Sequence, residues 1–100
     1  MDSNPETNLR LHAIVEGHVQ GVGFRYYVSE QALFMGLTGW VRNVYDGQVE
    51  VVAEGRRADL EKLLRYIERG PSGAHVFSMS EDWSPARGEF QRFSIAPTEF

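Results

Sequence analysis

The chain has 100 residues, of which ten are Lys or Arg and 14 are Asp or Glu, so its formal net charge is −4. It contains no cysteine, which excludes disulfides, thiolate catalysis and cysteine-ligated zinc or iron–sulfur sites. The acidic balance argues against a general nucleic-acid binder, which needs a basic face to release counterions. No apolar run approaches a membrane span, and the polar start lacks the features of a signal peptide. We therefore expect a cytoplasmic protein with a flexible tail over residues 1–8 and a single domain over residues 9–100.

The first predicted strand covers residues 9–16, where apolar and polar residues alternate. Its core-facing residues are expected to be Leu9, Leu11, Ala13 and Val15. After a glycine-rich stretch, apolar spacing predicts a helix over residues 24–35 that ends at Gly36. Its outer face carries Tyr26, Leu33 and Phe34, for which we expect partial burial by neighbouring side chains; a weak self-association face is the alternative.

The rest of the chain predicts four more strands and a second helix. Asp46-Gly47 lies between strands over residues 37–44 and 49–54, which indicates an antiparallel hairpin. A helix follows over residues 58–69, with Glu61 and Arg65 spaced as an ion pair. A loop containing His75, a strand over residues 76–83 and a closing strand over residues 90–96 complete the chain. The order predicts an α+β, ferredoxin-like split β-α-β sandwich (βαββαβ), whose mostly antiparallel sheet carries both helices on one face.

The glycine-rich stretch has the properties of an anion site. Gly17, Gly21 and Gly23 lie between a strand and a helix, where free backbone N–H groups and the positive end of the helix dipole point the same way. Arg25 adds a planar, permanently charged guanidinium group that can donate hydrogen bonds to two phosphate oxygens. Tyr26 stands where a dinucleotide-binding motif needs a small residue, and no Gly-Lys-Ser/Thr follows, so neither nucleotide motif fits. The alternative is a tight connection with a solvated arginine.

Several polar residues outside the glycine-rich stretch also bear on a possible site. Asn43 ends the strand before the hairpin, where its amide could hold one water near the mouth of the loop; its alternative role is to initiate the turn. Glu16 and Asp46 are expected to be structural. His12 is expected on the open sheet face and His75 in a loop, and no carboxylate cluster with metal spacing accompanies them, so no metal site is predicted.

Two motifs resemble signatures of the acylphosphatase family. The first is Gly17-His18-Val19-Gln20-Gly21-Val22-Gly23-Phe24-Arg25. The second is Gly39-Trp40-Val41-Arg42-Asn43-Val44-Tyr45-Asp46-Gly47-Gln48-Val49, running on to Gly55. Both match at the defining positions, with the expected interval between them, and the resemblance extends from Leu9 to Ile95.

The resemblance implies hydrolysis of acyl phosphates to a carboxylate and inorganic phosphate. It implies that Arg25 binds the phosphate and that Asn43 orients the attacking water. The phosphate-binding loop, which we call the cradle loop, would comprise His18, Val19, Gln20, Gly21, Val22, Gly23 and Phe24, with Arg25 following it. The leaving carboxylate belongs to an acid with a pKa near ~4, so it departs without a general acid, and no metal or cofactor is required. A small-molecule acyl phosphate is the expected partner, and we expect a monomer.

Two other functions stay open. The chain could be an acyl or carbamoyl phosphate-binding domain with little turnover, although its stand-alone length argues against this. It could also be an RNA-binding ferredoxin-like module, but residues 48–54 contain no stacking aromatics and carry Glu50 and Glu54.

Overall fold

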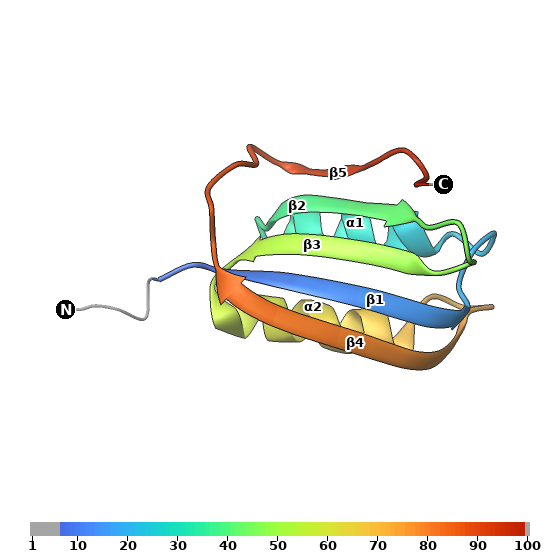
Figure 1. The fold of residues 1–100 in the computed structure, drawn as a ribbon. Helices are drawn as coiled ribbons and strands as arrows, with labels where there is room; N and C mark the ends of the chain where they lie inside the picture. Colours follow the sequence, from blue (N-terminus) through green and yellow to red (C-terminus); the bar gives the residue numbers. More distant parts are fainter. Residues whose placement is uncertain (1–6, 100) are drawn as a thin grey trace.

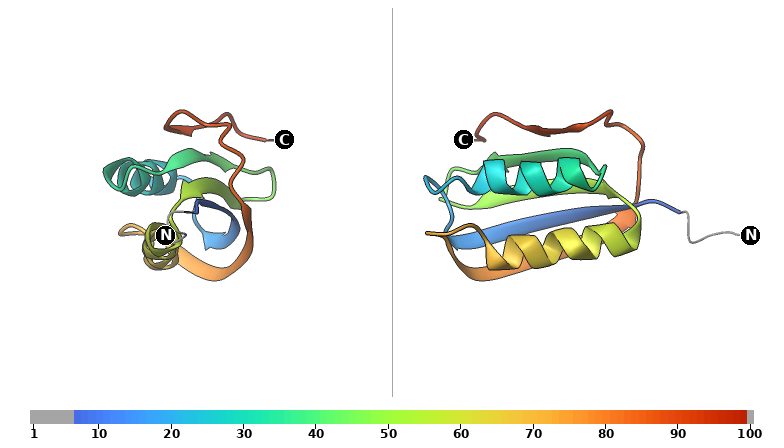
Figure 2. Two further views of the ribbon diagram at one scale, coloured as in Figure 1. Left: turned by 90° about the vertical axis from the view of Figure 1, so that its left-hand side faces the viewer. Right: turned by 180° about the vertical axis from the view of Figure 1, so that it is seen from behind.

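The computed structural model describes residues 7–99, so the expected tail lies mostly outside the described residues. The strands are β1 (Leu9–His18), β2 (Thr38–Asn43), β3 (Val49–Gly55), β4 (His75–Pro85) and β5 (Phe93–Ile95), and the helices are α1 (Phe24–Phe34) and α2 (Arg57–Arg69). They build one sheet in the order β4-β1-β3-β2-β5, with both helices on one face (Figures 1 and 2). β5 runs parallel to β2, and the other paired strands are antiparallel. The predicted ferredoxin-like arrangement is confirmed.

All five strands differ from their predicted bounds: β1 runs two residues further, to His18, which is the first residue of the cradle loop, and β2 and β3 differ by one residue at their ends. The differences are largest for β4 and β5. β4 is longer than expected because it pairs with β1 along its whole length, from Leu9 opposite Pro85 to His18 opposite His75. The prediction that His75 lies in a loop was therefore wrong. β5 is shorter than expected, because the residues between Pro85 and Phe93 carry the chain from one edge of the sheet to the other.

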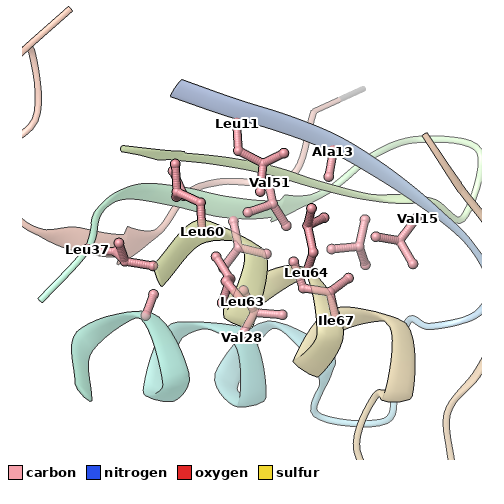
Figure 3. Packing of buried hydrophobic residues seen from close by; sticks show 14 of the residues in the cluster. Leu11, Ala13, Val15, Val28, Leu37, Val51, Leu60, Leu63, Leu64 and Ile67 are labelled. Carbon is pink, nitrogen blue, oxygen red and sulfur yellow. The ribbon is translucent and has the colours of Figure 1, made fainter. Parts of the chain in front are cut away.

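The core lies between the sheet and the helices. Leu11, Ala13 and Val15 alternate along β1 and are completely buried, as the sequence pattern predicts, whereas Leu9 at the start is only partly buried. The opposing layer comes from α2, whose buried residues Leu60, Leu63, Leu64 and Ile67 recur at helical spacing. Figure 3 shows these side chains packed against those of β1, β3 and α1. Burial of each large aliphatic side chain contributes about 1.5–3 kcal/mol relative to its exposed state.

Two expectations about the helix surfaces were wrong. Tyr26 and Phe34 are 76% and 89% exposed, so neighbouring side chains do not bury them as expected, whereas Leu33 is 48% exposed, in line with partial burial. On α2, Glu61 pairs with Arg57, whose Nε lies 3.0 Å from its Oε2, and not with Arg65. Arg57 and Arg65 each lie four residues from Glu61, and the observed partner is Arg57, the first residue of α2.

Glu54 is the most buried carboxylate on the open face of the sheet, with only 4% of the residue exposed. It accepts hydrogen bonds from Arg10 Nε at 2.8 Å and from the backbone N–H groups of Arg87 and Gly88 at 2.9 and 3.0 Å. Burial acts to raise the pKa of Glu54, but these donors outweigh it and hold the pKa below its ordinary value. The carboxylate thereby joins β1, β3 and the segment that leads to β5.

The variant Glu54→Gln should be less stable than the wild type at pH 7, by about 1–3 kcal/mol, because a neutral amide leaves Arg10 without its buried charge partner. A carboxylate with a depressed pKa stabilises the fold above its unfolded-state value near 4.5 and loses this contribution as the pH falls through its folded-state value. The stability difference should therefore narrow at pH 3. Urea unfolding at both pH values measures it, with Glu68→Gln on exposed α2 surface as the control. An equal difference at both pH values would contradict the charge-based explanation.

Candidate active site

The chain turns from β1 into α1 through a β-bulge. The β1–β4 register shifts between Glu16 and Gly17, and Gly17 adopts a φ of +141°. A Cβ at Gly17 would overlap the carbonyl oxygen of His75 on β4. Only glycine fits this close approach of two backbones, and the bulge re-aims the end of β1 toward the cradle loop.

The cradle loop exposes its backbone while its side chains hold it in place. Val19 and Phe24 are 1% exposed, and Val22 packs against the same core. Gly21 and Gly23 between them both have a φ of +76°, and Gly23 caps α1 without any side-chain hydrogen bond. Within the described part of the chain, the N–H groups of residues 20–26 donate no backbone hydrogen bond. These donors lie at the positive end of α1, where the helix dipole favours a negative charge.

Arg25 follows in the first turn of α1 and is half-buried. No carboxylate among the described residues is paired with its guanidinium. Arg10 and Arg42, in contrast, both have carboxylate partners on the open face of the sheet. The charge of Arg25 therefore adds to the donors of the cradle loop instead of being neutralised by the protein.

The first turn of α1 is fixed to α2 by Tyr27. Its hydroxyl donates a hydrogen bond of 2.9 Å to the carbonyl oxygen of Tyr66, and its ring meets that of Tyr66 edge to face. Burial raises the pKa of Tyr27, which favours the neutral phenol that donates this bond. Arg25 thus projects from a helix turn whose position is set by the neighbouring helix.

Asn43 is the last residue of β2, and its backbone carbonyl accepts a 3.0 Å hydrogen bond from the N–H of Glu99. Its Oδ1 is buried and has no hydrogen-bond partner among the described residues. A buried amide oxygen without a partner is costly, unless a water or a ligand completes it. Among the described residues, Asn43 Oδ1 is the one buried side-chain acceptor without a hydrogen-bond partner.

The structure brings Asn43 to the cradle loop by a route that the sequence did not predict. β2 is not adjacent to β1, because β3 lies between them. The turn between β2 and β3 instead lies at the same end of the sheet as the cradle loop (Figures 1 and 2). Gln20 joins the two, since its Nε2 donates to the carbonyl oxygens of Val44 and Gln48, at 2.9 Å each. No spacing in the sequence signals a contact across more than twenty residues.

Two other polar residues considered for a site, Glu16 and His12, have hydrogen-bond partners within the protein. Glu16 accepts hydrogen bonds from Ser78 Oγ at 2.8 Å and Gln48 Nε2 at 2.6 Å, and these bonds lower its pKa. It therefore has a structural role, as expected, while Asp46 is an exposed turn residue. His12 lies 2.6 Å from Glu50 on the open face. Between Thr7 and Glu99, no three His, Asp or Glu side chains gather in a way that could hold a metal ion.

These features define a ferredoxin-like domain with unpaired backbone N–H donors at one end of its sheet. The sequence profile of the family described as Acylphosphatase matches residues 11–95. An acylphosphatase from Pelotomaculum thermopropionicum is 48% identical over 87 residues, which cover 87% of this chain and 95% of that protein. The crystal structure of acylphosphatase from Bacillus subtilis is 40% identical, with a TM-score of 0.85 over 88% of this chain and 98% of that one. The chain belongs to the acylphosphatase family, and it is an enzyme that hydrolyses acyl phosphates.

A further similarity is to part of a much larger protein. The crystal structure of full-length HypF, in a phosphate- and nucleotide-bound form, matches 94% of this chain with 28% identity and a TM-score of 0.84. The match covers 12% of the HypF chain. The same fold thus also occurs as one segment of a longer polypeptide.

We expect Gly17→Ala to be more destabilising than Gly21→Ala. Both residues have a positive φ, which costs an alanine about 1–2 kcal/mol. A Cβ at Gly21 meets nothing within 4 Å, whereas one at Gly17 overlaps the backbone of β4 and forces β1 and β4 apart. Urea unfolding of the two variants measures the difference. Equal losses would show that the close approach at the bulge can relax without cost.

Proposed function

We propose that the cradle loop and Arg25 bind the phosphoryl group and that Asn43 holds the attacking water. The observation that carries this proposal is the meeting, at one end of the sheet, of a loop with unpaired N–H donors and an amide with an unpaired buried oxygen. The first suits the phosphoryl oxygens, which are acceptors. The amide oxygen of Asn43 suits a water molecule, because it can accept a hydrogen bond from the water and leave the lone pair of the water oxygen free to attack phosphorus.

The reaction requires few groups from the protein. The water oxygen bonds to phosphorus as the bond from phosphorus to the acyl oxygen breaks, and the electron pair leaves with the carboxylate. Because the acid of this leaving group has a pKa near ~4, no general acid is needed. The proton of the water passes to a phosphoryl oxygen. The protein contributes position and charge stabilisation, which account for most of the catalysis of phosphoryl transfer.

Removal of either side chain should abolish most of the activity. Arg25→Ala and Asn43→Ala should each lower kcat/KM for benzoyl phosphate by at least about 100-fold, or ~2.7 kcal/mol, as expected for loss of a transition-state donor. Arg65→Ala and Asn8→Ala, which change exposed residues elsewhere, are the matched controls. Activity should also persist with excess chelator. Substantial turnover without both Arg25 and Asn43, or a requirement for added divalent metal, would refute this mechanism.

Arg25→Lys should fail nearly as severely as Arg25→Ala. A lysine keeps the charge but presents a single ammonium group, which cannot contact two phosphoryl oxygens in one plane. We expect kcat/KM to recover by no more than about tenfold relative to the alanine variant, a difference of ~1.4 kcal/mol. Steady-state hydrolysis of benzoyl phosphate distinguishes the two cases. Wild-type rates for the lysine variant would show that charge alone suffices.

A second function is supported by the similarity to HypF, whose structure holds phosphate and nucleotide. In that case the domain would bind an acyl or carbamoyl phosphate tightly and turn it over slowly. Single-turnover rates and the affinity for inorganic phosphate separate the two functions. Slow turnover combined with tight binding would favour the binding domain.

We further propose that residues 9–100 act as one cytoplasmic domain and as a monomer. All residues of the proposed site come from a single chain, so no second copy is needed to complete it. Nucleic acid is not an expected partner, since the net charge is −4. Light scattering and a gel-shift assay at low salt test these two points.

A further inference from the structure

We infer that Gln20 is a positioning residue that fixes the water-binding Asn43 relative to the phosphate-binding cradle loop. The inference rests on the proposed function, because it assigns Gln20 a role in the same reaction. It differs from the phosphate-binding role expected for this part of the loop. The side chain of Gln20 is engaged with the turn between β2 and β3, so it contributes to the site through Asn43.

The contacts of Gln20 leave its amide nitrogen fully used. Nε2 has two hydrogens, and it reaches two acceptors, the carbonyl oxygens of Val44 and Gln48, at 2.9 Å each. These two residues are also joined to each other, because Val44 N–H donates to Gln48 O at 2.8 Å. Gln20 therefore holds both sides of the turn at its narrowest point. Val44 directly follows Asn43, so this contact lies one residue from the proposed water site.

A second contact limits the movement of the same turn. Gln48 Nε2 donates to Glu16 Oε2 at 2.6 Å, and Glu16 also accepts from Ser78 on β4. The turn is thus bound to the residue that precedes the bulge as well as to the middle of the cradle loop. On its other side, the Asn43 carbonyl is held by Glu99. With Gln20 removed, the cradle loop loses its hydrogen bonds to Val44 and Gln48, next to Asn43, while these outer contacts remain.

The chemistry of an amide suits this position. A carboxylate would repel both carbonyl oxygens and the phosphate, and an ammonium would add a second cation beside Arg25. A neutral amide supplies two donors and leaves the charge of the site unchanged. Gln20 is half-buried, so its hydrogen bonds are partly shielded from competing water.

Gln20→Met should lower kcat for benzoyl phosphate by about 10- to 100-fold, the scale expected when a reacting group is misplaced by about 1 Å. Methionine matches the length of glutamine but has no donor. The inhibition constant of inorganic phosphate should change less than about threefold, because the cradle N–H groups and Arg25 remain. Gln31→Met, which makes the same substitution on α1, is the matched control and should leave kcat unchanged.

A double-mutant cycle with Asn43→Ala tests whether Gln20 acts through Asn43. If it does, Gln20→Met should have little further effect on kcat in the Asn43→Ala background. Multiplicative losses, or a parallel loss of phosphate affinity, would overturn the inference. Gln20→Asn, which keeps both donors but is one methylene shorter, should also lower kcat and serves if the methionine variant does not fold. Full activity of Asn43→Ala would instead refute the proposed function, whereas an inactive Asn43→Ala with fully active Gln20→Met would refute only the role of Gln20.

Discussion

The site depends on one break in the hydrogen bonding of the backbone. Almost every polar backbone group in a folded domain is paired, because an unpaired buried donor is costly. At the turn from β1 to α1 the bulge at Gly17 shifts the register of β1 against β4, and the N–H groups of the described residues 20–26 donate no backbone hydrogen bond. The buried Val19 and Phe24 prevent the loop from relaxing inward. In the proposed function, the phosphoryl oxygens of the substrate supply the acceptors for these N–H groups.

Ion pairs on the open face of the sheet use other arginines of the chain. On the open face, Arg42 pairs with Glu50 at 2.8 Å and with Glu99 at 3.2 Å, and Glu99 also holds the backbone of Asn43. Arg42 is thus neutralised within the structure, although it precedes Asn43 directly. In a protein whose net charge is −4, Arg25 has no carboxylate partner among the described residues, whereas Arg10 and Arg42 are used in pairs. This division favours a dianionic substrate at one place without making the whole surface basic.

Local patterns in the sequence predicted much of the fold, but not the contacts between its distant parts. Strand alternation, the spacing of α2 and the Asp46-Gly47 turn are all local, and each was confirmed. The error for His75 arose because β4 is defined by its pairing with β1, which its blurred alternation does not reveal. The exposure of Tyr26 and Phe34 depends on which elements pack against α1, and local patterns in the sequence do not show this. Candidate site residues could be named from two motifs, yet the contact of Gln20 with the turn required the topology.

That contact explains how a site with so few side chains can be specific. Because the substrate already carries a good leaving group, the reaction requires a correct distance between water and phosphorus more than a strong acid or base. Arg25 belongs to a helix, whereas Asn43 belongs to a strand that is not adjacent to β1. Independent fluctuations of a helix turn and a hairpin would change this distance. We infer that the half-buried amide of Gln20, which donates to two carbonyl oxygens of the turn, limits that freedom without adding a charged or titrating group beside the phosphate.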